Sequence, residues 1–98
     1  MAQVVYSPNA VGNLERLFRF LAENNPDSAV RTLRAIRDRL QILQRHPRIG
    51  PADPEHPDFR ELFISFGAAG YVARYRLTGS VVVILAVRHM REAGYHET

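Results

Sequence analysis

Apolar residues recur at helical spacing through the first half of the chain. From residue 8 to residue 22 they form a single stripe, with polar residues on the opposite side. The stripe contains Ala10, Val11, Leu14, Leu17, Phe18, Leu21 and Ala22, and the polar side contains Asn13, Glu15, Arg16 and Arg19. This spacing predicts an amphipathic helix. Ser7 followed by Pro8 favours a helix start, because the hydroxyl caps free backbone N–H groups and proline suits the first helical position.

A second helical pattern begins at Asn25-Pro26, again a capping residue followed by proline. Its apolar residues follow alternating steps of four and three: Ala29, Leu33, Ile36, Leu40 and Leu43. Arginines dominate the other positions, and the pattern ends at His46-Pro47. The two stripes predict a short antiparallel pair of helices, and we expect four leucines to lie between this pair and a sheet: Leu17, Leu21, Leu33 and Leu40. Five stripe positions are too few to favour a coiled-coil dimer.

Strand patterns fill the rest of the chain. The expected strands are residues 3–6, 59–66, 71–77 and 81–87, with turns at residues 67–70 and 78–80. Four prolines make residues 47–57 an irregular, stiff connection. The order β-α-α-β-β-β predicts an α+β fold, in which an antiparallel sheet carries the α-helical hairpin on one face. We expect residues 1–98 to form one domain.

The last expected strand, VVVILAV, is apolar on both faces. Such a strand is normally central in a sheet and covered on both sides. Two helices cover only one face, so the other face needs a second cover. An exposed apolar sheet flanked by arginine indicates a partner surface, and we expect a partner to lie there.

Composition narrows the class of protein. With 46% apolar and 23% charged residues, the 98-residue chain has the composition of a globular protein. It has no cysteine, which excludes disulfides and thiolate metal sites. No secretory leader and no membrane-spanning run is expected from the pattern. We therefore expect a cytoplasmic protein that does not bind membranes.

All the basic residues are arginine. Thirteen basic and ten acidic residues give a net charge of +3, and no lysine is present. Arginine binds carboxylate and phosphate through a planar fork and stays protonated, whereas any mechanism that needs a lysine is excluded. The four histidines are not spaced like metal ligands, and no glycine-rich nucleotide loop occurs. We expect neither a metal nor a cofactor.

The stretch LAVRHMREAGY near the C-terminus concentrates the candidate chemistry. An apolar strand changes there into a charged segment that contains Arg88, His89, Arg91 and Tyr95. Such residues can bind a target or a phosphate, and histidine can transfer protons. Plainer roles fit as well. Arg88 can pair with Glu92, Tyr95 can pack against the edge of the core, and His89 at a strand end is more often simply hydrogen-bonded.

Taken in order, these motifs resemble the RelE/ParE superfamily of toxins from type II toxin–antitoxin systems, with the ParE-like branch closest. The resemblance covers nearly the whole chain: the first strand, the Ser-Pro start, the helical hairpin, and then LQRHPRIG, FREL, YVARYR and ILAVRHMREAGY. It implies a small cognate antitoxin, ParD-like, whose acidic or partly disordered segment wraps the toxin in a hetero-oligomer. The candidates for binding this antitoxin are Arg60, Arg74 and Arg76.

The resemblance leaves two modes of action open. ParE-like toxins poison DNA gyrase without hydrolysis, and the candidate contacts for such a target are Arg88, His89, Arg91 and Tyr95. RelE-like toxins cleave mRNA on the ribosome, and the positions that match that function are Glu61, Arg74, Arg76, Arg88, His89 and Tyr95. Glu61 and His89 would form the proton-transfer pair. Because the lysines of the RelE pattern are replaced by Arg60-Glu61, we expect a gyrase-binding toxin that is not an enzyme, with the ribosome-dependent endoribonuclease as the alternative.

Overall fold

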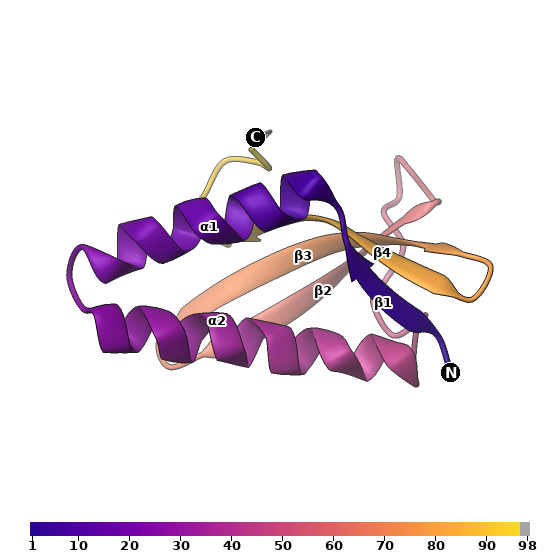
Figure 1. Cartoon of the computed structure of the whole chain (residues 1–98). Helices are drawn as coiled ribbons and strands as arrows, with labels where there is room; N and C mark the ends of the chain where they lie inside the picture. Colours follow the sequence, from indigo (N-terminus) through magenta and orange to yellow (C-terminus); the bar gives the residue numbers. More distant parts are fainter. Residues whose placement is uncertain (97–98) are drawn as a thin grey trace.

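A computed structural model describes residues 1–96, which form a helical hairpin packed on one face of a four-stranded sheet (Figure 1). The elements are β1 (Gln3–Tyr6), α1 (Pro8–Ala22), α2 (Pro26–Leu40), a short 3-10 helix (Gln41–Gln44), β2 (Phe59–Phe66), β3 (Ala69–Thr78) and β4 (Val81–His89). This order confirms the predicted β-α-α-β-β-β α+β fold. Within the described residues, no helix is long and apolar enough to cross a membrane.

The strands lie in the order β1-β4-β3-β2, so the first and last strands of the chain are neighbours. β2, β3 and β4 pair antiparallel, as predicted. β1 instead runs parallel to β4, with Gln3 opposite Val81 and Tyr6 opposite Ile84. The sheet is therefore mixed rather than wholly antiparallel. A parallel neighbour needs a long crossover instead of a hairpin turn, and the helices together with β2 and β3 provide one.

Both helices begin where their capping residues predict. Ser7 Oγ accepts a hydrogen bond from the backbone N–H of Ala10 at 3.1 Å. Asn25 Oδ1 accepts one from the N–H of Ser28, also at 3.1 Å. α2 ends at Leu40, earlier than its apolar pattern suggested, because the chain tightens there into the 3-10 helix.

The main core lies between the helices and the sheet. Leu17 and Leu40 are buried there as expected, whereas Leu21 and Leu33 are only partly buried. The largest fully buried side chains are Tyr71, Tyr75, Ile36, Leu40, Leu43, Ile64 and Ile84. Tyrosine rings from β3 thus supply much of the core volume, and each needs a partner for its hydroxyl group.

The proline-rich connection is tied to the core at its start. The Tyr75 hydroxyl donates to the carbonyl of Pro47 at 2.8 Å and accepts from the N–H of Gly50 at 3.0 Å. A Cβ atom on Gly50 would lie 2.5 Å from the Glu61 carbonyl oxygen and 2.8 Å from the Tyr75 hydroxyl, so a larger residue does not fit. The Glu61 N–H also donates to Pro51 at 3.2 Å. These contacts hold the connection along β2 and bring Asp53 to the sheet.

α1 is rotated about its axis relative to the predicted stripe. Asn13, expected on the polar side, is 1% exposed, whereas Val11 and Phe18 are 45% and 37% exposed. The buried row is Ala10, Asn13 and Leu17. We attribute the rotation to the fit of this row against β4, where a methyl group and an amide allow the helix and strand backbones to approach closely.

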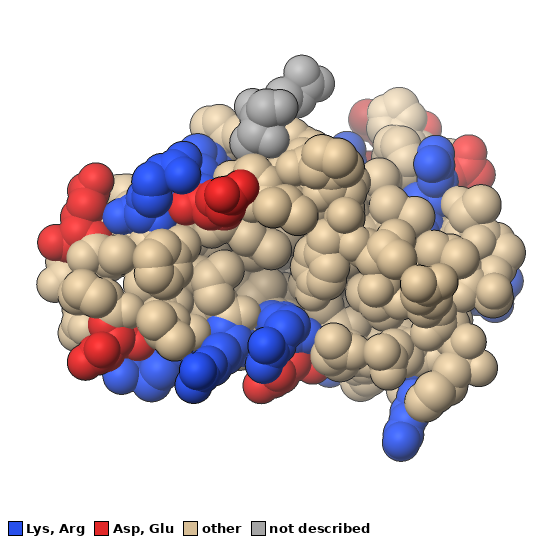
Figure 2. Space-filling view, viewed as in Figure 1, with Lys and Arg blue, Asp and Glu red and all other residues tan. Residues whose placement is uncertain are grey.

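The rotation leaves an apolar groove of about 450 Å³ between the helices. It is lined by Tyr6, Val11, Leu14, Phe18, Val30, Leu33, Arg34, Ile36 and Arg37. Figure 2 views this side and shows arginines along α2, with a mostly uncharged strip between the two helices. Most of the side chains that line the groove are apolar.

The chain covers part of the second sheet face with Tyr95 from its own tail (residues 90–96), whereas Arg91, Glu92 and His96 of the tail line a cavity with α1. Val72 and Ala86 point to this face and are buried. Their register partners are Arg88 and Arg74, and Tyr95 from the tail lies against both arginines. The tail therefore supplies part of the cover that the sequence pattern had assigned wholly to a partner.

Candidate functional site

Four of the candidate residues meet on the sheet face that points away from the helices: Glu61, Arg74, Arg88 and Tyr95. The register places Glu61 of β2 opposite Arg74 of β3, and Arg88 of β4 opposite Val72, so all three candidates on strands share one face. Tyr95 returns to them from the tail. Together with Asp53, these four residues are referred to below as the open-face cluster.

Tyr95 lies at the centre of the open-face cluster. Its hydroxyl donates a hydrogen bond to Glu61 Oε2 at 2.6 Å. Its ring contacts two guanidinium groups, with Arg74 Cζ 4.7 Å and Arg88 Cζ 5.0 Å from the ring centroid. Cations are attracted to the face of an aromatic ring. Phe59 offers Arg74 a second ring, at 5.4 Å. Directional contacts therefore fix the position of Tyr95.

Arg88 holds the turn that leads into the tail. Its Nη1 donates to the backbone carbonyls of His89 at 3.3 Å, Met90 at 3.3 Å and Glu92 at 3.0 Å. The predicted pairing of Arg88 with the Glu92 carboxylate does not form, because the tail is not helical. That carboxylate instead pairs with Arg16 of α1 at 3.1 Å. The Nη1 group of Arg88 is thus used within the chain.

The charges of the open-face cluster balance. Arg74 lies 3.3 Å from Asp53 Oδ2 and 3.9 Å from Glu61 Oε2. With Arg88, two guanidinium groups accompany two carboxylates. An anion that enters the cluster would have to displace a carboxylate or share an arginine with one.

Two pKa shifts follow from this arrangement. Burial raises the pKa of Tyr95 well above the ordinary tyrosine value, and the hydrogen bond to the Glu61 carboxylate raises it further. The N–H of Glu55, which donates to Asp53 Oδ1 at 2.8 Å, holds the pKa of Asp53 below its usual value, with smaller help from Arg74. At neutral pH the Tyr95 phenol is protonated and Asp53 is ionised.

His89 lies on the other face of the sheet. It is opposite Tyr71 in the register, and the two rings contact each other edge to face with centroids 5.2 Å apart. Its Nδ1 accepts a hydrogen bond from the N–H of Arg91 at 3.0 Å. The structure therefore does not bring Glu61 and His89 together as a proton-transfer pair. The surroundings of His89 match the plainer role considered from the sequence, a hydrogen-bonded histidine at the end of a strand.

The remaining candidate arginines lie apart from the open-face cluster. Arg91 is exposed on the tail. Arg60 and Arg76 lie near the start of β2, around a cavity of about 210 Å³ that Arg48 also lines. Arg60 donates to the carbonyls of Arg48 at 3.1 Å and Gly50 at 2.8 Å. The three arginines proposed for antitoxin binding thus occupy two places, with Arg74 inside the cluster.

Sequence reasoning missed Asp53 and Asn13. Asp53 belongs to the proline-rich connection, where no periodic pattern predicts a neighbour for its carboxylate. Asn13 was assigned to solvent because it is polar, although it lies three residues from Ala10 and four from Leu17, in helical register with buried positions. That spacing was the available signal. Within residues 1–96, no three histidine, aspartate or glutamate side chains converge as ligands for a metal ion.

Comparisons with known proteins match the chain over almost its full length. The family model described as the ParE toxin of type II toxin–antitoxin systems, parDE, matches residues 4–94. Toxin RelE3 of Caulobacter vibrioides is 37% identical over 92 residues, covering 94% of this chain and 98% of that protein. Toxin RelE1 of the same organism is 35% identical over 86 residues, covering 88% and 90%.

A solved structure shares the fold. A chain of the chromosomal ParDE toxin–antitoxin system from P. aeruginosa superposes with a TM-score of 0.72, covering 91% of this chain and 96% of its own, at 20% identity. At that identity the likeness concerns the fold alone. The family model and the two relatives agree with the resemblance in the sequence motifs. The chain belongs to the ParE toxin family of type II toxin–antitoxin systems, within the RelE/ParE superfamily.

Proposed function

We propose that this toxin acts by direct contact with DNA gyrase and does not itself cleave RNA. The ParE-like branch, which the motifs resemble most, poisons gyrase in this way. The observation that carries the proposal is the charge-balanced open-face cluster, in which Arg74 already faces two carboxylates. The chemistry of RNA cleavage explains why this matters.

Cleavage of RNA through its 2′-hydroxyl needs a base, an acid and cations that stabilise a crowded phosphate. Glu61 could act as the base, but His89 lies on the opposite face and cannot serve as its acid. Tyr95 is a weak proton donor, because burial and the Glu61 carboxylate raise its pKa. Arg74 faces two carboxylates, so the cluster offers little net positive charge to a phosphate.

The exposed side of the tail suits protein contact. Met90 is half-exposed and Arg91 is exposed, beside the turn held by Arg88. Arginine and methionine are enriched in protein interfaces. In this proposal Arg91 and Met90 touch the target, Arg88 and Tyr95 hold the tail in shape, and His89 packs on Tyr71.

The second partner that we propose is a ParD-like antitoxin. Type II toxins are paired with an antitoxin, and the solved relative belongs to a ParDE system. Arg60 and Arg76 offer positive charge at one end of the sheet, and an acidic segment would complement them. The complex would be a hetero-oligomer. Arg74 is a weaker candidate for this contact than the sequence suggested, since Asp53 and Glu61 already flank it.

One observation favours the ribonuclease as a second candidate. Glu61, Arg74, Arg88 and Tyr95 meet in space, and both Caulobacter relatives are named RelE. The buried Nε atoms of Arg74 and Arg88 have no hydrogen-bond partner among the described residues, so a rearrangement that uncovered them would offer two donors to an acceptor. If RNA displaced the Tyr95 hydroxyl from Glu61, a base and two cations would be close together.

Two assays on one preparation separate these functions. Purified toxin is added to gyrase with supercoiled plasmid, and separately to a translating extract whose mRNA is examined by primer extension. We expect cleaved plasmid complexes and no codon-positioned cuts. Discrete mRNA cuts without plasmid cleavage would overturn the gyrase proposal.

Glu61→Gln and Arg91→Ala sharpen the test. Glutamine keeps the shape of Glu61 and an acceptor for Tyr95 but cannot take a proton. For a gyrase toxin we expect it to leave potency nearly unchanged, whereas for a ribonuclease it should lower the cleavage rate by about 10²–10⁴-fold. Arg91→Ala should weaken gyrase binding by ~1–3 kcal/mol. Arg39→Ala removes the same charge from an exposed position in the last turn of α2 and serves as its control.

A further inference from the structure

We propose that Asn13 of α1 is the positioning residue that holds the C-terminal tail, and with it Tyr95, in place on the sheet. The inference rests on the proposed function to the extent that the tail carries the target contacts. Asn13 is an unusual residue for its place in the core. Asn13 lies in the buried row of α1 between Ala10 and Leu17, where an apolar residue would normally be found.

The edge of β4 explains why an amide is present. β1 ends at Tyr6, opposite Ile84, whereas β4 continues to His89. β3 pairs with one edge of this second half of β4, but in the described part of the chain no strand lies along the other edge. Side chains from the start of α1 take the place of a strand: Ser7 Oγ and Asn9 Nδ2 donate to the Leu85 carbonyl at 3.2 and 3.0 Å.

Asn13 satisfies the next backbone group along the same edge. Its Oδ1 accepts a hydrogen bond from the N–H of Val87 at 3.0 Å, in a buried setting. The register between β3 and β4 shifts just before this point, which leaves Leu85 as an extra, bulged residue. Bulges disrupt the regular ladder of hydrogen bonds, and the disrupted edge must find other partners. An apolar residue in place of Asn13 would leave the Val87 N–H buried and unpaired.

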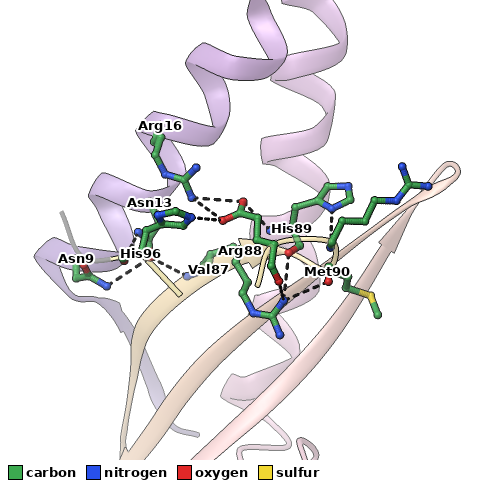
Figure 3. A network of polar contacts seen from close by, with 10 residues as sticks. Asn9, Asn13, Arg16, Val87, Arg88, His89, Met90 and His96 are labelled. Atoms are coloured by element: carbon green, nitrogen blue, oxygen red, sulfur yellow. Dashed lines mark hydrogen bonds and ion pairs between the residues drawn. The ribbon is translucent and has the colours of Figure 1, made fainter. Parts of the chain in front are cut away.

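The other end of the same amide holds the tail. Asn13 Nδ2 donates to the carbonyl of His96 at 2.9 Å, and Figure 3 shows the side chain between Val87 and the returning tail. One buried group therefore fixes both ends of the segment from residue 87 to residue 96. Tyr95 directly precedes His96, so fixing that carbonyl restricts where the Tyr95 ring can lie.

A second contact supports the tail but is weaker. Arg16, one turn further along α1, pairs with Glu92 at 3.1 Å, and Glu92 Oε2 also lies 2.8 Å from His96 Nε2. Arg16 and His96 are substantially exposed, so water weakens both contacts and salt screens the ion pair with Arg16. The bond between Asn13 and the Val87 N–H is buried and the bond to the His96 carbonyl is partly buried, so breaking the first leaves a backbone N–H without water. Asn13 is therefore the stronger determinant of the tail position.

The test follows Tyr95 directly. Fluorotyrosine is incorporated into the full chain, and the ¹⁹F signal of Tyr95, one of four tyrosines, is assigned with Tyr95→Phe. Asn13→Asp is nearly isosteric and keeps an acceptor for the Val87 N–H. An ionised carboxylate cannot donate a hydrogen bond to the His96 carbonyl, so this variant loses only the bond to the tail. Asn13→Ala removes both bonds. In both variants we expect the Tyr95 signal to move to the solvent-exposed position, while the other three signals stay in place.

Target potency is measured on the same samples. Gyrase poisoning should fall roughly tenfold, the equivalent of one lost hydrogen bond. The control is Ile36→Val, which removes one methyl group from a buried side chain of α2 that lines the groove between the helices. It should lower the thermal midpoint and leave the Tyr95 signal and the potency per folded molecule unchanged.

The possible failures are distinguishable. A Tyr95 signal that stays in place in folded Asn13 variants overturns the positioning role, whatever the target is. Unsubstituted toxin that is inactive in both target assays overturns the proposed function, while the Tyr95 signal still decides the role of Asn13. If neither Asn13 variant folds, the positioning role is tested by NMR on the unsubstituted protein. Nuclear Overhauser contacts between the Asn13 amide protons and His96 support the inference, and their absence overturns it.

Discussion

The two faces of the sheet are covered in different ways. On the helix face, two amphipathic helices bury a continuous apolar core that includes Tyr71, Tyr75 and Ile84. On the other face, a short tail is held by the Tyr95–Glu61 hydrogen bond, stacked arginines and the Asn13 amide. The cover on the helix face depends on buried apolar area, and apolar contacts do not require a fixed geometry. The cover on the other face depends on a few bonds of fixed geometry.

Because of this difference, the global stability and the local opening of the protein depend on separate parts of the molecule. Apolar burial contributes about 25 cal/mol per Å², so the helix face dominates the free energy of unfolding. Each bond of the tail contributes only about 1 kcal/mol, and regions held by few contacts open locally without global unfolding. The surface that we propose for target contact thus lies on the cover that can open while the fold remains intact.

The largest effect should come from the helix face. Leu40→Ala removes a fully buried side chain and should lower the free energy of unfolding by ~2–5 kcal/mol. Urea denaturation measures this loss. Val30→Ala, at an exposed position on the same helix, is the matched control and should cost far less. A denaturation midpoint that Leu40→Ala leaves unchanged would mean that the helix register is wrong.

A smaller and more local effect should come from the tail. Tyr95→Phe keeps the ring between Arg74 and Arg88 but removes the hydrogen bond to Glu61, at a cost of about 1 kcal/mol. Hydrogen exchange should accelerate at the Met90 and Glu92 amides and stay slow in β3. Equal acceleration in both regions would show that the tail and the core open together.

Alkaline pH should affect the same contact. The pKa of Tyr95 is raised in the folded state, so the unfolded tyrosine ionises first, near its ordinary value of about 10. The stability from this shift is complete below pH ~10 and is lost as the pH rises toward the folded pKa, at up to about 1.4 kcal/mol per pH unit. Denaturation at pH 9 and pH 11 should show a steeper loss for the unsubstituted chain than for Tyr95→Phe. Parallel losses would contradict the assigned shift.

The smallest effect is expected on the solvent side of α2. Arg37 pairs with Asp38 at 3.4 Å, and both side chains are largely exposed. Arg37→Gln should change the free energy of unfolding by less than ~0.5 kcal/mol, since exposed ion pairs contribute little. Arg16→Gln, which breaks the half-exposed pair with Glu92, should speed hydrogen exchange in the tail more than Arg37→Gln does. If the two variants gave equal exchange rates, the tail would not depend on that pair.

Local signals were enough to predict most of the fold. The Ser7-Pro8 and Asn25-Pro26 starts act within one helical turn, and the alternation along β3 places Arg74 opposite the tyrosine face. The rotation of α1 could not be predicted in this way, because the partner of Asn13 is the Val87 N–H, 74 residues away. The inward row of a helix depends on the surface that it meets.

The candidate site was predictable in its residue types but not in its geometry. Whether Arg88 or His89 faces Glu61 depends on the register of β4, and a one-residue shift would exchange them. The bulge at Leu85 sets that register, and nothing in the run VVVILAV marks it. Asp53 reaches the open-face cluster from the irregular proline-rich connection. In such a segment the direction of a side chain depends on its contacts and not on a regular repeat along the chain.

The pairing of β1 with β4 has a consequence for how the protein is made. The ribosome adds Gln3 to the chain nearly eighty residues before its partner Val81 and before Ser80, whose carbonyl accepts the Gln3 N–H. Contacts of such long sequence separation form slowly, because a large loop must close first. Until then, β1 and the apolar row of α1 lack the strand on which they pack. A nascent chain of this protein therefore cannot complete its sheet before β4 emerges from the ribosome.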